Sequence, residues 1–226
     1  MKKCILLMII FSIIIVNIHA QENIPVITLE KYIDNMQSYF QNKNDRIIYE
    51  TISVYENNLY MFMLDQLDNI LVYFFYGIKV DNIRRYNNFK NIVNRRGVDR
   101  LIYLFDVIDN NDIGTFLSEL EASAELNDIY WTLYFSSGNV QYLNNLLTVI
   151  KNYHNESNNV IFYFAARSAM WSMTLNIQTY PQVRNHFNRS NIIDNSLKDY
   201  IRNTHPEIQR NDTVEFIRQQ RENGIW

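Results

Sequence analysis

The scarcity of glycine and proline constrains the fold of this chain more than any other feature of its sequence. These residues interrupt regular structure most strongly, and the 226 residues include only five glycines and three prolines. Gly77, Gly97, Gly114 and Gly138 are spaced so that each gap holds one helix and a short turn. We therefore expect a series of helices with turns at these four glycines.

Apolar residues between the glycines recur at the helical step of three or four, as in Tyr86, Phe89 and Val93. Alternating patterns are scarce, and only residues 41–60 contain pieces that could form short strands. The sequence predicts an all-α fold of about 10–12 helices, arranged as stacked hairpins in a solenoid or an irregular bundle. We expect helices over residues 29–41, 46–57, 60–76, 81–95, 98–109, 112–123, 127–137, 139–153, 159–179, 181–188, 194–203 and 212–222.

Residues at several helix starts have the expected chemistry. Asp112 and either Asn127 or Asp128 are good N-caps, since a short side-chain oxygen can accept a hydrogen bond from an unpaired first-turn N–H group. Pro181 and Pro206 stand where a helix can begin, because the first turn loses nothing when an N–H group is missing.

Two stretches, 68–86 and 128–146, resemble each other in outline: an aromatic helix, a glycine and a second amphipathic helix. This similarity favours stacked helical hairpins. It also bears on the polar break Ser136–Asn139, which is either a turn between two helices or the edge of an active site. The hairpin interpretation favours the turn, with Gly138 ending one helix at positive φ and Asn139 starting the next.

The first 20 residues have the features of a secretory signal peptide: two lysines, an apolar run of about 13 residues and Ala20 before Gln21. The run is short for a membrane span. We expect export to the periplasm or the extracellular space, with an uncleaved anchor over residues 4–18 as the alternative. The mature chain, residues 21–226, is then predicted to be one domain. Its core spans residues 61–205 and its C-terminal helix residues 206–226, and its helical pattern is weakest in residues 21–60.

Charge and cysteine content restrict the possible partners. Removal of residues 1–20 leaves 19 basic and 24 acidic residues and no cysteine. The acidic balance argues against nucleic acid, which binds basic surfaces, and no disulfide can support the fold. We expect a protein or peptide partner, no nucleic acid, and no stable membrane insertion after signal cleavage.

Motifs for catalysis or metal binding are absent from the sequence. His154, His186 and His205 are the only histidines after residue 20, and no two have a ligand spacing. Ser168 lies in a predicted helix and outside any nucleophile motif, and no stretch holds two nearby glycines that could bind phosphate. The sequence therefore predicts no cofactor and no catalytic residues.

The segment from Val160 to Leu175 is apolar on nearly every side, which predicts a helix in the centre of the domain. Arg167 interrupts it, and a buried guanidinium group needs a partner, for which Asp128 or Glu125 is expected. In the simpler interpretation Arg167 forms a structural ion pair or reaches solvent, and Trp131 and Trp171 belong to the core. In the alternative, Arg167 forms the floor of a groove with the two tryptophans as walls.

Residues 128–183 resemble a family of exported bacterial helical proteins for which no activity is established. The likeness covers about half of the mature chain, mostly residues 65–187, and implies a shared helical architecture. It depends on Trp131, Phe135, Ser137, Gly138, Asn139, Ala165, Ala166, Trp171, Ser172, Asn176, Pro181 and Val183.

These observations favour an exported, non-catalytic helical scaffold or binding module. The alternative is an enzyme with a site near Arg167 and the Ser136–Asn139 turn. The residues expected to contact a ligand or partner are Asp128, Trp131, Asn139, Arg167, Trp171 and Asn176.

Overall fold

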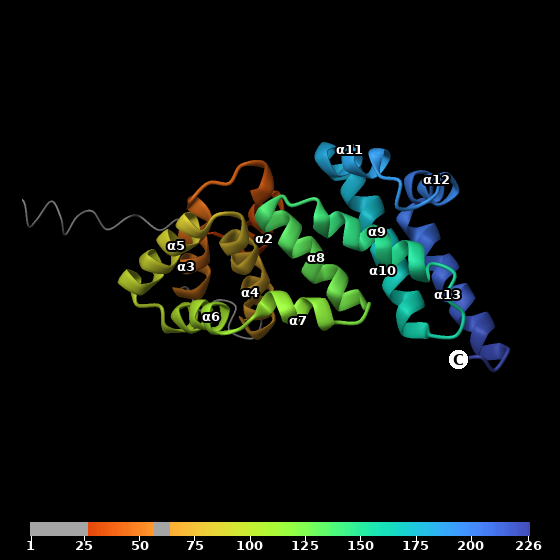
Figure 1. The fold of residues 1–226 in the computed structure, drawn as a ribbon, viewed down its shortest axis with the longest axis horizontal. Coiled ribbons are helices and arrows are strands. Elements are labelled where there is room, and N and C mark those ends of the chain that lie inside the picture. The colour runs from red at the N-terminus through yellow and green to blue at the C-terminus, as the bar shows by residue number, and fades with distance from the viewer. Residues whose placement is uncertain (1–26, 57–63) are drawn as a thin grey trace, which may run out of the picture.

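A computed structural model describes residues 27–56 and 64–226, and these residues form an all-α structure without strands (Figure 1). The all-α prediction is confirmed, whereas the predictions for residues 1–20 fall outside the described residues. A short 3-10 helix, η1 (Tyr39–Gln41), follows the first described helix. The α-helices are α2 (Leu29–Ser38), α3 (Arg46–Glu56), α4 (Leu64–Asp81), α5 (Ile83–Arg96), α6 (Asp99–Asn110), α7 (Ile113–Glu119), α8 (Ala124–Ser137), α9 (Gln141–Tyr153), α10 (Val160–Thr179), α11 (Pro181–Arg189), α12 (Asn195–Asn203) and α13 (Pro206–Glu222).

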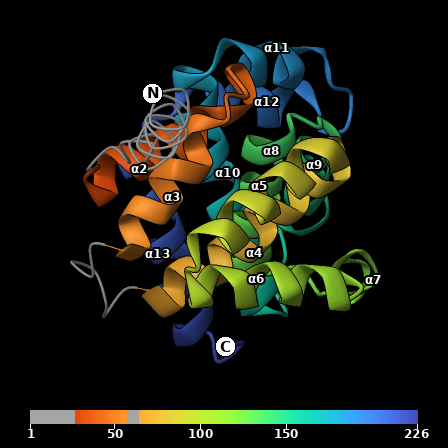
Figure 2. The ribbon, with the colours of Figure 1, turned by 90° about the vertical axis from the view of Figure 1, so that its left-hand side faces the viewer.

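Two apolar cores lie along the molecule. The first joins α2 to α6 through side chains such as Leu71, Phe75 and Phe105. The second joins α8 to α12 through side chains such as Leu146 and Ala169. Helices α4 and α8 pack against each other where the cores meet, and α8 lies between α4 and α10 in Figure 1. In the view of Figure 2, α2 and α3 cover one side of the bundle and α6 and α7 lie beneath α4.

Two of the four expected glycine turns are confirmed. Gly97 and Gly138 have φ values of 74° and 73°, and their N–H groups bond to Val93 and Tyr134 at the ends of α5 and α8. The other two are wrong, because Gly77 lies inside α4 and Gly114 inside α7. Gly77 instead allows close packing, since a Cβ atom there would overlap the Ser136 Oγ on α8.

The correction at Gly77 also changes the proposed repeat. In residues 128–146 the glycine ends a helix, whereas in 68–86 the helix continues past it to Asp81. The matching glycines therefore have different structural roles. Each stretch still spans two consecutive helices, α4 with α5 and α8 with α9.

The helix starts follow local capping chemistry, with one correction. Asp112 caps α7 by accepting a hydrogen bond from the Thr115 N–H group, and Pro181 and Pro206 begin α11 and α13, as expected. Asn127 and Asp128 are not N-caps, because Ser123 starts α8 and accepts from the Leu126 N–H group. The serine offers an equally short oxygen four residues before Asn127.

Helix α10 differs from its prediction. Its expected burial on nearly every side is wrong, because Ile161, Phe164, Trp171 and Leu175 are exposed. Helices α8, α9 and α13 cover three of its sides. The fourth side carries an apolar row that the described residues leave open to solvent.

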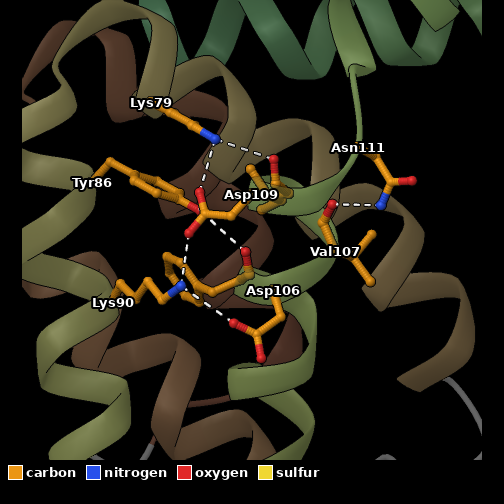
Figure 3. A network of polar contacts seen from close by, with 9 residues as sticks. Lys79, Tyr86, Lys90, Asp106, Val107, Asp109 and Asn111 are labelled. Carbon is orange, nitrogen blue, oxygen red and sulfur yellow. Dashed lines mark hydrogen bonds and ion pairs between the residues drawn. The ribbon is translucent and has the colours of Figure 1, made fainter.

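A polar network fastens α4, α5 and α6 (Figure 3). The Asp109 carboxylate accepts hydrogen bonds from Lys79 Nζ at 2.8 Å, Lys90 Nζ at 2.7 Å and the Tyr86 hydroxyl at 3.0 Å. Lys90 also reaches Asp106 at 3.2 Å. The donors come from α4 and α5 and the acceptors from α6, so one cluster holds three helices in register.

Candidate functional site

A groove with a cavity volume of about 710 Å³ lies where α2, α4, α7 and α8 meet. Helix α8 forms its longest wall, since Glu125, Asp128, Thr132 and Phe135 recur at helical steps and so share one face. The other walls are formed by Ile33, Met36 and Gln37 of α2, Leu67, Asn69, Ile70, Tyr73 and Phe74 of α4, and Phe116 with Leu120, Glu121 and Ser123 in and after α7.

The floor of the groove is apolar and rigidly packed. Trp131 and Phe135 stack with ring centroids 5.5 Å apart, and Phe74 and Met36 are buried beside them. The Trp131 indole N–H group donates to Ser172 Oγ on α10 at 2.9 Å. Because α10 satisfies this polar atom, Trp131 presents only apolar surface to the groove.

The rim of the groove exposes large apolar side chains. Ile33, Ile70 and Phe116 are 39%, 46% and 51% exposed, and they come from three different helices. Apolar side chains gathered around a concave surface are typical of a binding site, because covering them removes apolar area from water.

One wall of the groove is acidic. Glu121, Glu125 and Asp128 line it, and the described lining residues include no Lys, Arg or His. Desolvation by the surrounding wall, together with the nearby Glu125 carboxylate, raises the pKa of Asp128. Burial and the same Glu125 carboxylate raise the pKa of Tyr73 on the facing helix. The groove thus has a negative potential that no lining cation offsets.

Arg167 lies away from this groove and has other partners than expected. Its guanidinium group donates to Thr213 Oγ1 at 2.8 Å, to the Tyr200 hydroxyl at 2.9 Å and to the Gln209 carbonyl at 3.1 Å. The expected pairing with Asp128 or Glu125 is wrong. Asp212 is linked to Arg167 only through the Tyr200 hydroxyl. Arg167 therefore fastens α10 to α12 and α13, and it does not form a groove floor between Trp131 and Trp171.

The remaining candidate residues are dispersed. Trp171 is 47% exposed on α10, so its expected place in the core is wrong. The Asn139 side chain accepts from the Gln141 N–H group beside the start of α9, and Asn176 donates to the Ser172 carbonyl within α10. Of the six expected contact residues, only Asp128 and Trp131 line the groove.

The polar break at Ser136–Asn139 is a turn, as the hairpin interpretation expected, and Gly138 ends α8. The expected start at Asn139 is wrong, because α9 begins at Gln141 with Val140 at its N-cap. Ser136 and Ser137 belong to the last turn of α8, are buried, and donate to the Leu133 carbonyl. Both hydroxyl groups are thus used inside their own helix.

Sequence reasoning missed the groove residues on α2, α4 and α7, because periodicity does not show which helices meet. One signal could have indicated part of the acidic wall: Glu125 and Asp128 are three residues apart on α8, whereas Glu121 lies in the connection before that helix.

Within residues 27–56 and 64–226 no three His, Cys, Asp or Glu side chains are placed to hold a metal ion. In the same ranges no helix is both long and apolar enough to span a bilayer.

Comparison of the chain with protein-family models, curated proteins and solved structures finds no match. The resemblance to exported bacterial helical proteins therefore stays a prediction.

Proposed function

We propose that this protein is an exported, non-catalytic binding module that holds a protein or peptide segment in the groove between α2, α4, α7 and α8. The observation that carries the proposal is the apolar rim around a preformed concavity, with Ile33, Ile70 and Phe116 partly exposed on three helices. Residues 1–20 support export, to the periplasm or beyond the cell, with anchoring by residues 4–18 as the alternative.

Rigid walls favour binding of this kind. The groove residues stand on helices whose inner faces belong to the packed core, such as Phe74 on α4 and Leu126 on α8. A partner segment would therefore bind without ordering the walls, which lowers the entropy cost of association. Each square ångström of apolar rim that it covers contributes roughly 25 cal/mol before those costs.

The enzyme alternative near Arg167 and the Ser136–Asn139 turn has less support. Arg167 is hydrogen-bonded to three groups on α12 and α13, and the Ser136 and Ser137 hydroxyls donate within α8. These groups stabilise helix packing and a helix end. None of these hydrogen bonds directs the groups toward a cavity shared with the groove residues.

A peptide-display selection on residues 21–226 tests the proposal. Thr132→Trp fills the groove from α8, and Tyr103→Trp adds an indole at a side chain that is 71% exposed on α6, outside the groove. Selected peptides should lose about tenfold or more in affinity for Thr132→Trp and keep their affinity for Tyr103→Trp. Peptides that bind both variants equally well would place the binding surface elsewhere and contradict the proposal.

A further inference from the structure

Helix α10 packs beside α8, the helix that forms the longest wall of the groove. Asn127 of α8 donates to the Ala165 carbonyl and to Ser168 Oγ, and Trp131, one turn later, donates to Ser172 Oγ. The two contacts are four residues apart on each helix, from Asn127 to Trp131 on α8 and from Ser168 to Ser172 on α10. Since four residues make about one helical turn, α8 and α10 lie side by side and run in the same direction.

Helix α9 covers one side of this pair. Tyr142 stacks on Tyr130 of α8, and Tyr153 stacks on Phe162 of α10. The groove residues Asp128 and Thr132 lie on the face of α8 opposite Tyr130. The exposed row on α10 likewise lies opposite Phe162, so the groove and the row are on the same side of the molecule.

The row on α10 is long and apolar. Ile161, Phe164, Trp171 and Leu175 are 62%, 50%, 47% and 38% exposed. They form a second group of exposed apolar side chains, on the same side of the molecule as the groove rim, whose apolar residues lie on α2, α4 and α7.

The charged side chains that line the groove are all acidic. Glu121, Glu125 and Asp128 form no ion pair with the described residues, and no cation among the lining residues faces them. A partner that places cations opposite these carboxylates would satisfy them and would be attracted from a distance. A second copy of this chain is disfavoured, since residues 21–226 contain 19 basic and 24 acidic residues, a net charge of −5.

The walls also restrict the conformation of the partner. An extended strand gains affinity by pairing its backbone with a sheet edge, and the described walls of this groove are helices and the short connection between α7 and α8, with no strand. A helix satisfies its own backbone groups and presents apolar side chains on one face.

Building on the proposed binding function, we propose that the groove and the α10 row hold a basic amphipathic helix. Its apolar face would cover the groove floor and Trp171, and Lys or Arg residues along one edge would face Glu121, Glu125 and Asp128.

Two designed peptides of about five helical turns test this inference by fluorescence anisotropy with residues 21–226. They share one leucine face, and their remaining positions are lysine in one peptide and glutamate in the other. The lysine peptide should bind about tenfold or more tightly than the glutamate peptide. Its affinity should fall with added salt, and its circular dichroism should become more helical on binding.

A matched pair of variants locates the charge effect. The groove variant Glu121→Gln/Glu125→Gln/Asp128→Asn should lose most of the preference for lysine. The control Asp199→Asn/Glu207→Gln/Glu215→Gln removes the same amount of charge from exposed sites on α12 and α13. This control should keep the preference for the lysine peptide. Trp171→Ser should weaken binding of the lysine peptide without unfolding the protein, because the Trp171 side chain is half exposed. Equal losses in both triple variants would show non-specific attraction and overturn the inference.

The outcomes separate this inference from the proposed function. If both peptides bind equally and Thr132→Trp blocks both, the groove binds segments but the basic partner class is wrong. If neither peptide binds while display selection yields groove-directed peptides, the partner class is again wrong. If no peptide of any kind depends on the groove, the proposed function fails. A dimer in sedimentation velocity that Thr132→Trp dissociates would identify a second copy as the occupant and overturn the inference.

Discussion

Gly77 of α4 and Ser136 of α8 are packed so closely that the glycine has no room for a side chain. A Cβ atom at Gly77 would overlap the Ser136 Oγ and lie 3.1 Å from the Ser136 Cβ and 3.4 Å from the Leu133 carbonyl oxygen. This contact joins the two helices at the boundary between the apolar cores and beside the groove.

The first prediction concerns this contact. Gly77→Ala should lower the free energy of unfolding by about 1–2 kcal/mol, because overpacking outweighs the better helix propensity of alanine. Ser136→Gly in the same chain should recover part of this loss by removing the overlapping atoms. Urea denaturation of the single and double variants measures both effects. Additive losses in the double variant would show that the two residues do not compete for space.

The second prediction concerns the turn at Gly138. Its φ of 73° is unfavourable for residues with a Cβ atom, while the nearest atom to such a Cβ, in Phe40, lies 3.7 Å away. Gly138→Ala should therefore cost about 1 kcal/mol through backbone conformation alone. Gly138→Asn should cost less, since asparagine tolerates this conformation better.

Gly97 offers a matched comparison for Gly138. It has a φ of 74° and no atom within 4 Å of an added Cβ. Gly97→Ala should cost the same as Gly138→Ala in thermal or urea denaturation. A markedly larger cost at Gly138 would indicate crowding against Phe40 or Lys43 that the distances do not predict.

The third prediction separates the two tryptophans. Trp131 is 5% exposed and bonded to Ser172, whereas Trp171 is 47% exposed. Trp131→Ala should cost about 3–5 kcal/mol of stability, and Trp171→Ala should cost less than about 1 kcal/mol. Acrylamide quenching provides a second measurement, since Trp171→Phe should remove more of the quenchable emission than Trp131→Phe. Similar unfolding costs for both tryptophans would contradict the structure.

The fourth prediction concerns pH. Burial raises the pKa of Asp109, but hydrogen bonds from Lys79, Lys90 and Tyr86 outweigh it and lower the pKa from 3.8 to about 2. A carboxylate with a lowered folded-state pKa stabilises the protein above its unfolded pKa, and this stabilisation is lost as the pH falls toward 2. Since Asp109 remains partly open to solvent, we expect its ionised carboxylate to contribute only about 1 kcal/mol to the free energy of unfolding.

Asp109→Asn provides the measurement. The difference in free energy of unfolding between the natural chain and this variant should be largest above about pH 4 and should shrink between pH 4 and pH 2. A difference that stays constant over this range would show that the carboxylate does not titrate with the lowered pKa.

Local signals predicted much of the fold because helices form through contacts between near neighbours. The three-to-four spacing of apolar residues, the cap at Asp112 and the prolines at Pro181 and Pro206 each act within one or two helical turns. The same locality explains the errors. Asn127 resembles an N-cap in isolation, but in the bundle its amide donates to the Ala165 carbonyl of α10.

The candidate site was only partly predictable for the same reason. Asp128 and Trp131 were expected contact residues, and both line the groove. Their neighbours on α2 and α4 lie far away in the sequence and meet them only in the folded chain. Arg167 was expected to pair with an acid before it, whereas the helices that supply its partners come after it.

The sequence by itself determined that the chain is helical and where most helices begin and end, since periodicity and capping depend on residues a few positions apart. Tertiary structure alone decided the role of each residue between helices. Gly97 and Gly77 are both single glycines within helical patterns, yet one ends a helix at positive φ and the other admits Ser136 of a neighbouring helix. The packing of α8 against α2, α4 and α10 likewise decided which apolar side chains became core and which remained on an open surface, because burial depends on neighbours that only folding brings together.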